Sequence, residues 1–499
     1  MLWPEADRLV YAATAEIAAG NVVQAQAFLD QALHLEPGHL MALSKSAEVA
    51  LFRKDHALAL ALVDRILSVE PHFAPAWSCR GRAQWLAGDR RQAVTDIARA
   101  VDIQPPNAEY RLLLAQVSAW MGEARICTEA LAPLLHAGLT SPLDYAGALS
   151  VAGEQAVAEG RFEEAESLLA KALSLAPHLT PARMMRGMNL LRLGRYREGW
   201  ADYAAREQIL SLDPHGIGRN LPGEPWNGED LAGRHLLIAD DQGHGDAIQF
   251  FRFLPMLKAR GAGRITWRTF PALVRLFAAA APDVSVVDAV PHQDRFDLHC
   301  ISTALPRLLD TIPATIPAPE AYLRPAYRRG VARTQRAGQR LNVGLAWSGD
   351  ARHTRDHLRS IAAAQFLRLA DLPGINFHSL QHVVRPQDMP ALLQRAAIRR
   401  DVEQTTDFAD TAALIDRLDL VIAVDTGVAH LAAALGKPVW IILHVASDWR
   451  WMTVRHDSPW YSTVRLFRVA PEEWPNPADG GWDPVLDRVA AALRQHAAG

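Results

Sequence analysis

The apolar positions follow one rhythm in the first two hundred residues of the chain and another in the rest. In the first part, blocks of helix length are rich in Ala and Leu and end in proline, and similar letters return at a step of 34 residues. The step is marked by Pro37, Pro71 and Pro105 and by Ala25, Ala59 and Ala93. Proline ends such a block because it lacks an N–H and disfavours a helical residue before it. The pattern therefore predicts a series of similar helix pairs.

A single helix pair cannot bury its apolar side, so neighbouring pairs are expected to stack into a superhelix. Small residues stand where the two helices of a pair would meet closely, as at Ala47, Gly81, Gly153 and Gly187. We expect about six units over residues 1–212, with the stretch 107–142 the least regular. A generic helical bundle is the alternative, but several positions agree on one period. Such an array offers a surface to a peptide or protein and carries no chemistry of its own.

From about residue 235, short apolar runs alternate with segments of helix length. The predicted strands are 235–240, 264–267, 284–288 and 297–302, followed, after a proline-rich linker at 311–325, by 341–349, 375–381, 418–427 and 438–444. This alternation predicts parallel sheets with helices on both faces. We expect a linker at 213–234, one α/β domain at 235–335 and a second at 336–499. Two such domains place a ligand in the cleft between them, at the carboxyl ends of the strands.

Composition narrows the class of protein. The 499 residues include 52 Lys and Arg against 55 Asp and Glu, and this near-neutral balance argues against a dedicated nucleic-acid-binding protein. Cys79, Cys127 and Cys300 are too far apart for a zinc cluster or a disulfide framework, so a reducing compartment is expected. The N-terminal segment does not resemble a signal peptide, and no apolar run approaches the roughly 20 residues that cross a bilayer. We expect a cytoplasmic protein with no membrane span.

Three loops that follow predicted strands hold candidate chemistry. The first, DDQGHGD at 240–246, places two glycines and Asp246 just before a helix, although Asp246 alone is more simply explained as a helix N-cap. The second, at 347–360, has histidines and arginines suited to a diphosphate, but on charge alone a solvated loop is the better explanation. The third, at 424–438, begins a helix near Thr426 or Gly427, where small residues let a phosphate approach free N–H groups. His430 follows on its first turn, where a ligand contact and a structural role are equally supported.

Five segments carry a resemblance to a known family: QGHGDAIQFFRFLPMLKARGA, LAWSGDARHTRDHLRSI, FHSLQ, DFADTAALIDRLDLVIAVDTGVAHLAAALGKPVWIILH and SDWRWMTVRHDSPWYSTVRLFR. They resemble bacterial tetratricopeptide-repeat glycosyltransferases, some of which resemble flagellin glycosyltransferases. The catalytic half is similar to the lipopolysaccharide heptosyltransferases of glycosyltransferase family nine, and the overall plan to the O-linked N-acetylglucosamine transferases. The resemblance implies a tetratricopeptide-repeat superhelix followed by a GT-B pair of Rossmann-like α/β domains. It also implies inverting transfer without a metal ion, with the nucleotide-sugar bound mainly by the second domain.

The resemblance implies roles for individual residues. Asp246 matches the aspartate of the family's GxGD loop, the expected general base. The donor's sugar and diphosphate are expected at the DTxxAH motif, which is matched by Asp425, Thr426, Gly427 and His430. Further donor-binding candidates are Trp347, Ser348 and Gly349 beside the diphosphate, Arg359 and Ser360 of a His-Asp-Arg-Ser loop, and Gln381 near the nucleotide base. No cofactor is implied, because the nucleotide-sugar is a co-substrate.

The sequence departs from the family's usual pattern at two places that touch the expected cleft. The first loop, DQGHGDA, lacks the usual Glu, Leu and Thr at its outer positions, and Arg355 stands where Asn is usual. The predicted function is sugar transfer from a nucleotide-sugar to a protein, flagellin being one candidate, or to a glycan hydroxyl. The alternative is a non-catalytic scaffold with a degenerate transferase domain, but the chain retains Asp246, Asp425, His430 and Arg359 together. A nucleotide-sugar epimerase is disfavoured because that chemistry needs no acceptor-recruiting array.

Overall fold

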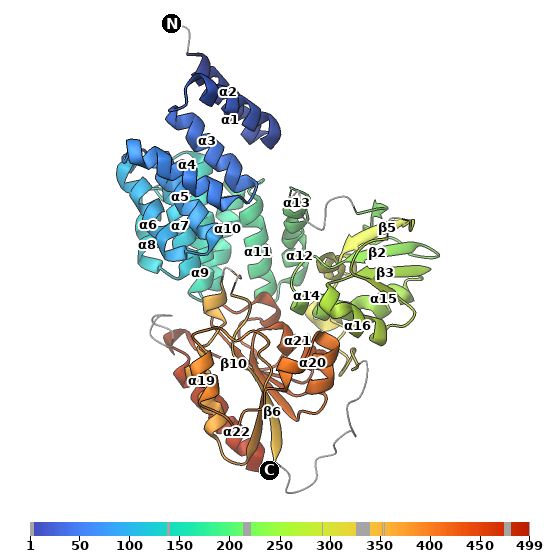
Figure 1. Cartoon of the computed structure of the whole chain (residues 1–499). Helices are drawn as coiled ribbons and strands as arrows, with labels where there is room; N and C mark the ends of the chain where they lie inside the picture. The colour runs from blue at the N-terminus through green and yellow to red at the C-terminus, as the bar shows by residue number, and fades with distance from the viewer. Residues whose placement is uncertain are drawn as a thin grey trace. The chain divides into compact units, whose positions relative to one another are not determined.

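The computed structural model describes residues 4–136, 140–212, 221–291, 293–325, 340–351, 353, 355–473 and 481–498. The chain divides into two compact units, whose elements are labelled in Figure 1. Unit 1 comprises Met1–Gln155 and Ser174–Pro177, and unit 2 comprises Ala156–Leu173 and His178–Gly499. The division falls within the helical part of the chain. The domain boundaries predicted at 212, 234 and 335 stay predictions, and residues 213–220 and 326–339 lie outside the described part.

Thirteen helices precede the first sheet in the described part of the chain, and the first twelve form successive pairs. Their bounds are α1 Glu5–Ala18, α2 Val22–Leu35, α3 Leu40–Phe52, α4 His56–Val69, α5 Ala74–Ala87, α6 Arg90–Ile103, α7 Ala108–Met121, α8 Ala124–Leu131, α9 Pro142–Ala158, α10 Phe162–Leu175, α11 Thr180–Arg192, α12 Tyr196–Tyr203 and α13 Ala205–Leu212. The predicted helix pairs are thereby confirmed. The stretch expected to be least regular contains α8, which has only eight residues.

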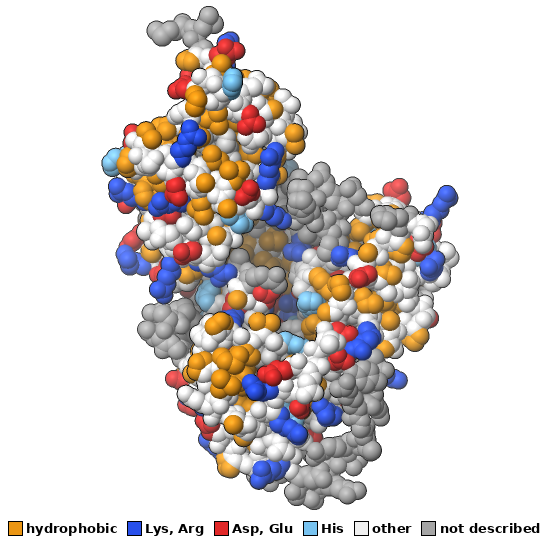
Figure 2. All heavy atoms as spheres, in the orientation of Figure 1, with side chains coloured by type: hydrophobic (Ala, Val, Ile, Leu, Met, Phe, Trp, Pro, Cys, Tyr) orange, Lys and Arg blue, Asp and Glu red, His pale blue; other side chains and the backbone are white. Residues whose placement is uncertain are grey.

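The residues that recur every 34 positions explain how the helix pairs of unit 1 pack. Helices α2, α4 and α6 each end two residues before a proline of the 34-residue series. Ala25, Ala59 and Ala93 are fully buried. At Gly81 a Cβ would lie 2.5 Å from Ile97, so only glycine lets α5 and α6 approach this closely. On the face shown in Figure 2, acidic and basic side chains are interspersed over the N-terminal helices rather than gathered by sign.

The first sheet of unit 2 is parallel, with the order β1-β5-β2-β3-β4. Its strands are β1 Glu224–Pro225, β2 His235–Ala239, β3 Arg264–Arg268, β4 Ser285–Val287 and β5 Leu298–Ile301, and its helices α14 His244–Phe250, α15 Leu254–Ala259, α16 Pro271–Ala280 and α17 Leu305–Leu308. All four strands expected here are present. The short edge strand β1 was not predicted: it lies in the expected linker, where two residues pair with β5 without a hydrophobic run.

The second sheet is also parallel, with the order β10-β9-β8-β6-β7. Its strands are β6 Leu341–Ala346, β7 Ile375–Ser379, β8 Leu420–Val424, β9 Val439–Leu443 and β10 Val464–Arg468, and its helices α18 Ala363–Phe366, α19 Met389–Leu393, α20 Phe408–Ile415, α21 Gly427–Ala434 and α22 Asp483–Ala498. Strand β10 was missed because Arg465 and Arg468 interrupt its apolar run, which an edge strand tolerates. Two parallel α/β sheets after a helical array agree with the predicted fold class.

The last helices of the repeat series share a core with the second sheet in unit 2. Tyr196 and Trp200 of α12 are buried against Trp449 and Trp460, which lie between β9 and β10. The ring centres of Trp200 and Trp449 are 5.1 Å apart, and those of Trp449 and Trp460 are 5.8 Å apart. Large aromatic side chains contribute strongly to such cores. The helices from α11 to α13 are therefore part of the structural support of the α/β region.

The proline-rich stretch at 311–325, expected to be a linker, is packed against the protein. The backbone N–H groups of Tyr322 and Leu323 both donate to the carbonyl of Ala434, at 3.0 and 3.1 Å. Leu323 is only 1 % exposed. The stretch therefore ties the end of the first α/β half to the end of α21. Among the described residues, no helix has the length and apolar character needed to cross a membrane.

Candidate active site

The second and third candidate loops lie side by side at the carboxyl edge of the second sheet. Strand β6 has β7 on one side and β8 on the other, so connections leave in opposite directions there. Ligands of such sheets bind at this switch point. Ala346 pairs in register with Ala423, so the loops that begin at Trp347 and Asp425 are neighbours.

Arg359 links these two loops. Its Nη1 donates to the carbonyl of Asp425 at 3.4 Å. Its guanidinium also lies against Gly349, where a Cβ would be 2.6 Å from Nε. Ser360 Oγ accepts from the N–H of Gly349 at 3.0 Å. The sequence did not single out Arg385, which donates to both the Gly349 carbonyl and Ser360 Oγ at 3.1 Å.

Three polar atoms at this edge have no hydrogen-bond partner in the described protein, although one of them, Arg359 Nε, lies at ion-pair distance, 3.6 Å, from Asp356 Oδ1. They are Ser348 Oγ, Arg359 Nε and Thr426 Oγ1, and all three atoms are buried. Buried polar groups are normally paired, so unpaired ones on two neighbouring loops suit a ligand. Thr426 also immediately precedes α21, whose first N–H groups attract anions. The set fits an anion rich in oxygen, such as a diphosphate.

Two predicted donor-binding side chains are instead occupied by the protein itself. Gln381 Oε1 accepts from the N–H groups of Trp347 and Ser348, both at 3.1 Å, and its Nε2 donates to two carbonyls. Trp347 is fully buried, and its Nε1 donates to Asp388 at 3.2 Å. We therefore expect both residues to shape the loop rather than to touch a ligand.

His430 and Asp425 form a buried pair at the start of α21. His430 Nε2 lies 3.5 Å from Asp425 Oδ1, and Nδ1 lies 2.7 Å from the Tyr461 hydroxyl. The His430 ring stacks on Trp451, with ring centres 5.3 Å apart. Burial alone would raise the pKa of Asp425, but His430 and the nearby Arg450 outweigh it and hold that pKa well below its usual range. Asp425 therefore stays ionised.

Asp246 lies in the first turn of α14, in the first half of the α/β region. The N-cap of α14 is Gly243 rather than Asp246, which is the third residue of the helix. Its Oδ2 accepts from the N–H of Gly243 at 3.1 Å. Asp246 is therefore not the N-cap residue that was expected. Its side chain instead accepts from the backbone N–H of the N-cap residue, three positions earlier. Its side chain is 17 % exposed.

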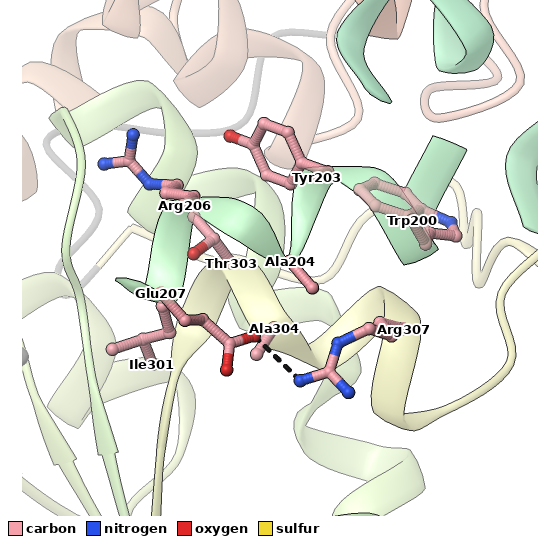
Figure 3. Close-up of a pocket in the computed structure, with 9 residues that line it drawn as sticks. All are labelled: Trp200, Tyr203, Ala204, Arg206, Glu207, Ile301, Thr303, Ala304 and Arg307. Carbon is pink, nitrogen blue, oxygen red and sulfur yellow. Dashed lines mark hydrogen bonds and ion pairs between the residues drawn. The ribbon is translucent and has the colours of Figure 1, made fainter. Parts of the chain in front are cut away.

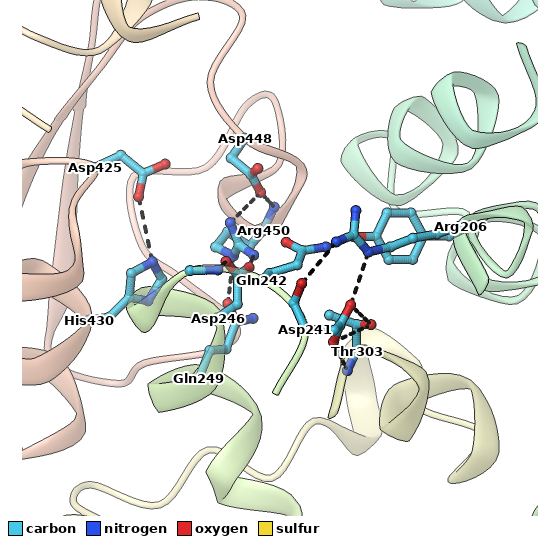
Figure 4. A network of polar contacts seen from close by, with 12 residues as sticks. Arg206, Asp241, Gln242, Asp246, Gln249, Thr303, Asp425, His430, Asp448 and Arg450 are labelled. Atoms are coloured by element: carbon cyan, nitrogen blue, oxygen red, sulfur yellow. Dashed lines mark hydrogen bonds and ion pairs between the residues drawn. The ribbon is translucent and has the colours of Figure 1, made fainter. Parts of the chain in front are cut away.

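The starts of α14 and α21 touch, which brings the two α/β halves together at the site. A Cβ on Gly245 would lie 2.8 Å from the His430 ring and 3.6 Å from the Cα of Gly427. Glycine is required at position 245 for this approach. Figure 4 shows Asp246 and His430 on the two sides of this contact, with Arg450 beside Asp246.

Arg450 was not among the predicted site residues. It is 7 % exposed and donates through Nη2 to Asp246, through Nε to Gln249 at 2.5 Å, and pairs through Nη1 with Asp448 at 2.9 Å. Burial alone would lower the pKa of Arg450, but its carboxylate neighbours, Asp448 first, raise it further above its usual range. The only sequence signal was its place in the SDWRW segment, to which no role was attached.

The carboxyl edge of the first sheet is closed by internal contacts. Asp241 has a fully buried side chain that accepts from Thr303 Oγ1 at 2.9 Å and from Arg206 of α13 at 3.1 Å. Burial raises the pKa of the neighbouring Asp240 to about 6, and its Oδ2 accepts from Trp267 at 3.1 Å. The cavity in Figure 3, between α12, α13 and this edge, has only about 10 Å³. That is room for about one water molecule.

Part of the second α/β half is similar to a known family. Residues 389–467 match glycosyltransferase family 9 (heptosyltransferase). Asp425, His430 and Arg450 lie inside this matched segment, and Asp246 lies outside it.

A curated relative matches a longer part of the chain. Protein FlbA of Caulobacter vibrioides is 30% identical over 347 residues, which are 64% of this chain and 56% of FlbA. The chain thus spans little more than half the length of this relative. Among solved structures, a thermophilic tetratricopeptide-repeat protein of Thermus thermophilus is 22% identical, covering 37% of this chain and 99% of that one, with a TM-score of 0.33. A repeat protein of Parabacteroides merdae is 15% identical, covering 41% and 85%, with a TM-score of 0.33.

Proposed function

We propose that this protein transfers a sugar from a nucleotide-sugar to a hydroxyl of a protein or glycan, with inversion and without a metal ion. The observation that carries the proposal is that Ser348 Oγ, Arg359 Nε and Thr426 Oγ1, three buried atoms without a hydrogen-bond partner in the described protein, lie on neighbouring loops at the edge of the sheet that holds the segment similar to family 9. A diphosphate would satisfy all three. Asp246 stands across the contact between the two halves, partly exposed.

The donor would bind with its diphosphate at Ser348, Arg359 and the start of α21. These groups stabilise negative charge, and they would do so most when the bond from the anomeric carbon to the phosphate oxygen breaks. The ionised Asp425 keeps His430 in place and close to that end of the helix. The donor side therefore supplies binding and leaving-group stabilisation.

The acceptor would react from the side of Asp246. Its hydroxyl oxygen forms the bond to the anomeric carbon, its proton passes to the Asp246 carboxylate, and the electron pair of the broken bond stays on the diphosphate. General base catalysis of this kind contributes roughly 10²–10⁴-fold. Attack from the face opposite the leaving group inverts the anomeric centre. We propose that the repeat helices recruit the acceptor and that the protein acts in the cytoplasm.

A nucleotide-release assay tests this function. The full-length protein is incubated with UDP-, GDP- and ADP-sugars, with and without acceptors that include flagellin. Acceptor-dependent release by wild type and its loss in Asp246→Ala are expected. Nucleotide binding without turnover against any acceptor would favour the scaffold alternative, and absence of both would refute the proposal.

A further inference from the structure

We propose that Arg450 is a positioning residue for Asp246, which it orients so that the acceptor proton is taken by Oδ2. The inference rests on the proposed function and deepens it, because it names the oxygen that receives the proton and the residue that selects it.

The two carboxylate oxygens of Asp246 differ in how many hydrogen bonds they already accept. Each carboxylate oxygen accepts two hydrogen bonds. Oδ1 accepts from Arg450, and Gln242, with its amide oriented so that both ends find partners, also donates to Oδ1 at 3.0 Å. Oδ2 accepts from the N–H of Gly243, with no second donor among the described residues. The open lone pair therefore lies on Oδ2.

Arg450 is suited to this task because its guanidinium is fixed in several directions. Its three guanidinium nitrogens contact Asp246, Asp448 and Gln249 at the same time, as Figure 4 shows. Its guanidinium carbon lies 4.8 Å from the centre of the Trp449 ring. A planar group with five N–H donors holds such a geometry, and the single ammonium of lysine does not. Rotation of Asp246 would break a charge-assisted hydrogen bond in a buried place.

The last repeat helices hold the loop that carries Arg450. Arg192 of α11 donates through Nε to the carbonyl of Ser447 at 3.1 Å. Gly160, between α9 and α10, leaves room for Val445, which a Cβ would approach to 2.6 Å. Trp449 packs on Trp200 of α12. The orientation of Asp246 is thus supported by helices of the repeat series as well as by the α/β sheets.

The test compares Arg450→Gln and Arg450→Lys with a matched control. Arg275→Gln removes another arginine that joins the two α/β halves, since Arg275 pairs with Asp407 and Asp410 at 2.7 and 2.6 Å. Arg275 is 47% exposed and lies on α16, and neither of these two ion pairs involves Asp246 or Arg450. We measure kcat and donor KM by nucleotide release, and affinity for the nucleoside diphosphate that wild type binds.

For Arg450→Gln we expect kcat to fall about 10- to 100-fold, because small misplacements of a catalytic group cost this much. Nucleoside diphosphate affinity should stay within about twofold, and Arg450→Lys should recover part of kcat because it keeps the charge. In an Asp246→Asn background, Arg450→Gln should cause little further loss, because the group it orients is already gone. Arg275→Gln should behave as wild type.

Three results would overturn the inference: wild-type kcat in Arg450→Gln, an equal loss of kcat in the Asp246→Asn background, or a tenfold loss of nucleotide affinity. The last would make Arg450 a ligand-binding or merely structural residue. Failure of the proposed function is recognised separately, because then wild type itself neither binds nucleoside diphosphates nor turns over any donor.

Discussion

The carboxyl edges of the two parallel sheets in unit 2 have the same backbone plan and opposite chemistry. At the first sheet, Asp241 is fully buried and bound by Thr303 and Arg206. At the second sheet, Ser348 Oγ and Thr426 Oγ1 are buried with no partner in the described protein. Asp241 is therefore satisfied by the protein's own side chains, whereas Ser348 and Thr426 are not, although Asp240 Oδ1 and Thr269 Oγ1 at the first edge are also buried without a hydrogen-bond partner among the described residues.

This difference in hydrogen bonding indicates that the two α/β halves, although they share a fold, have different functions. A switch point attracts ligands only while its polar groups are unsatisfied. In the first half, α13 brings Arg206 against Asp241, and the proposed contribution to chemistry comes from Asp246 on α14. The second half keeps the binding groups. Four changes test this division, from the largest expected effect to the smallest.

Replacing Asp246 by Ala should lower transfer roughly 10²- to 10⁴-fold, the range of general base catalysis. Nucleoside diphosphate affinity should stay unchanged, because the donor groups lie in the other half. Initial rates of nucleotide release and calorimetric titration measure the two effects. Asp283→Ala, at an exposed aspartate of the same half, is the control. Equal rates in wild type and Asp246→Ala would remove Asp246 from the chemistry.

Replacing Arg206 by Met should destabilise unit 2 by about 3 kcal/mol, since it leaves the buried Asp241 without its cation. Urea unfolding followed by tryptophan fluorescence measures the change. The control is Arg197→Met, because Arg197 of α12 and its partner Asp310 are 70% and 75% exposed, and such pairs contribute little. Unchanged stability in Arg206→Met would mean that the first edge is not closed by this contact.

Replacing Asp240 by Asn tests the burial of charge at the same edge. Burial raises the pKa of Asp240 from 3.8 to about 6, so the folded protein binds this proton more tightly than the unfolded chain does. Its contribution to stability is therefore full below about pH 4 and is lost as the pH rises through about 6.

At pH 7 the Asn variant should be more stable than wild type by up to about 3 kcal/mol, and the difference should disappear near pH 4. Urea unfolding at pH 4, 5, 6 and 7 measures it, with the exposed Asp288→Asn as control. If the variant and wild type differed in the free energy of unfolding by the same amount at all four pH values, the raised pKa of Asp240 would be contradicted.

Replacing Arg359 by Met should weaken binding of a nucleoside diphosphate about tenfold or somewhat more, as loss of a hydrogen bond to a charged group does. Calorimetric titration measures affinity, and Arg395→Met, which breaks an ion pair with the half-exposed Asp371 in the same half, is the control. If both variants bind equally well, the second edge is not the phosphate site. If Asp246→Ala rather than Arg359→Met lost affinity for the nucleoside diphosphate, the phosphate site would lie in the first half.

Periodicity was enough to predict the helix pairs and eight strands, because buried faces repeat with the geometry of the element they belong to. It missed β1 and β10, which lie at sheet edges and need no continuous apolar run. The motif loops at Asp246, Ser348 and Asp425 could be listed from their position after strands. The roles predicted for Trp347 and Gln381 could not be judged, since the sequence does not tell whether a polar side chain is already satisfied internally.

The sequence by itself determined the order of elements, the two parallel sheets and the loops where chemistry belongs, because each depends on spacing within one segment. Only the tertiary structure decided that Arg206 closes the first edge, that Gly245 lets α14 meet His430, and that Arg450 reaches Asp246. The last two residues are 204 positions apart in the sequence. Contacts of this kind depend on how separately folded elements pack, and no local pattern records them.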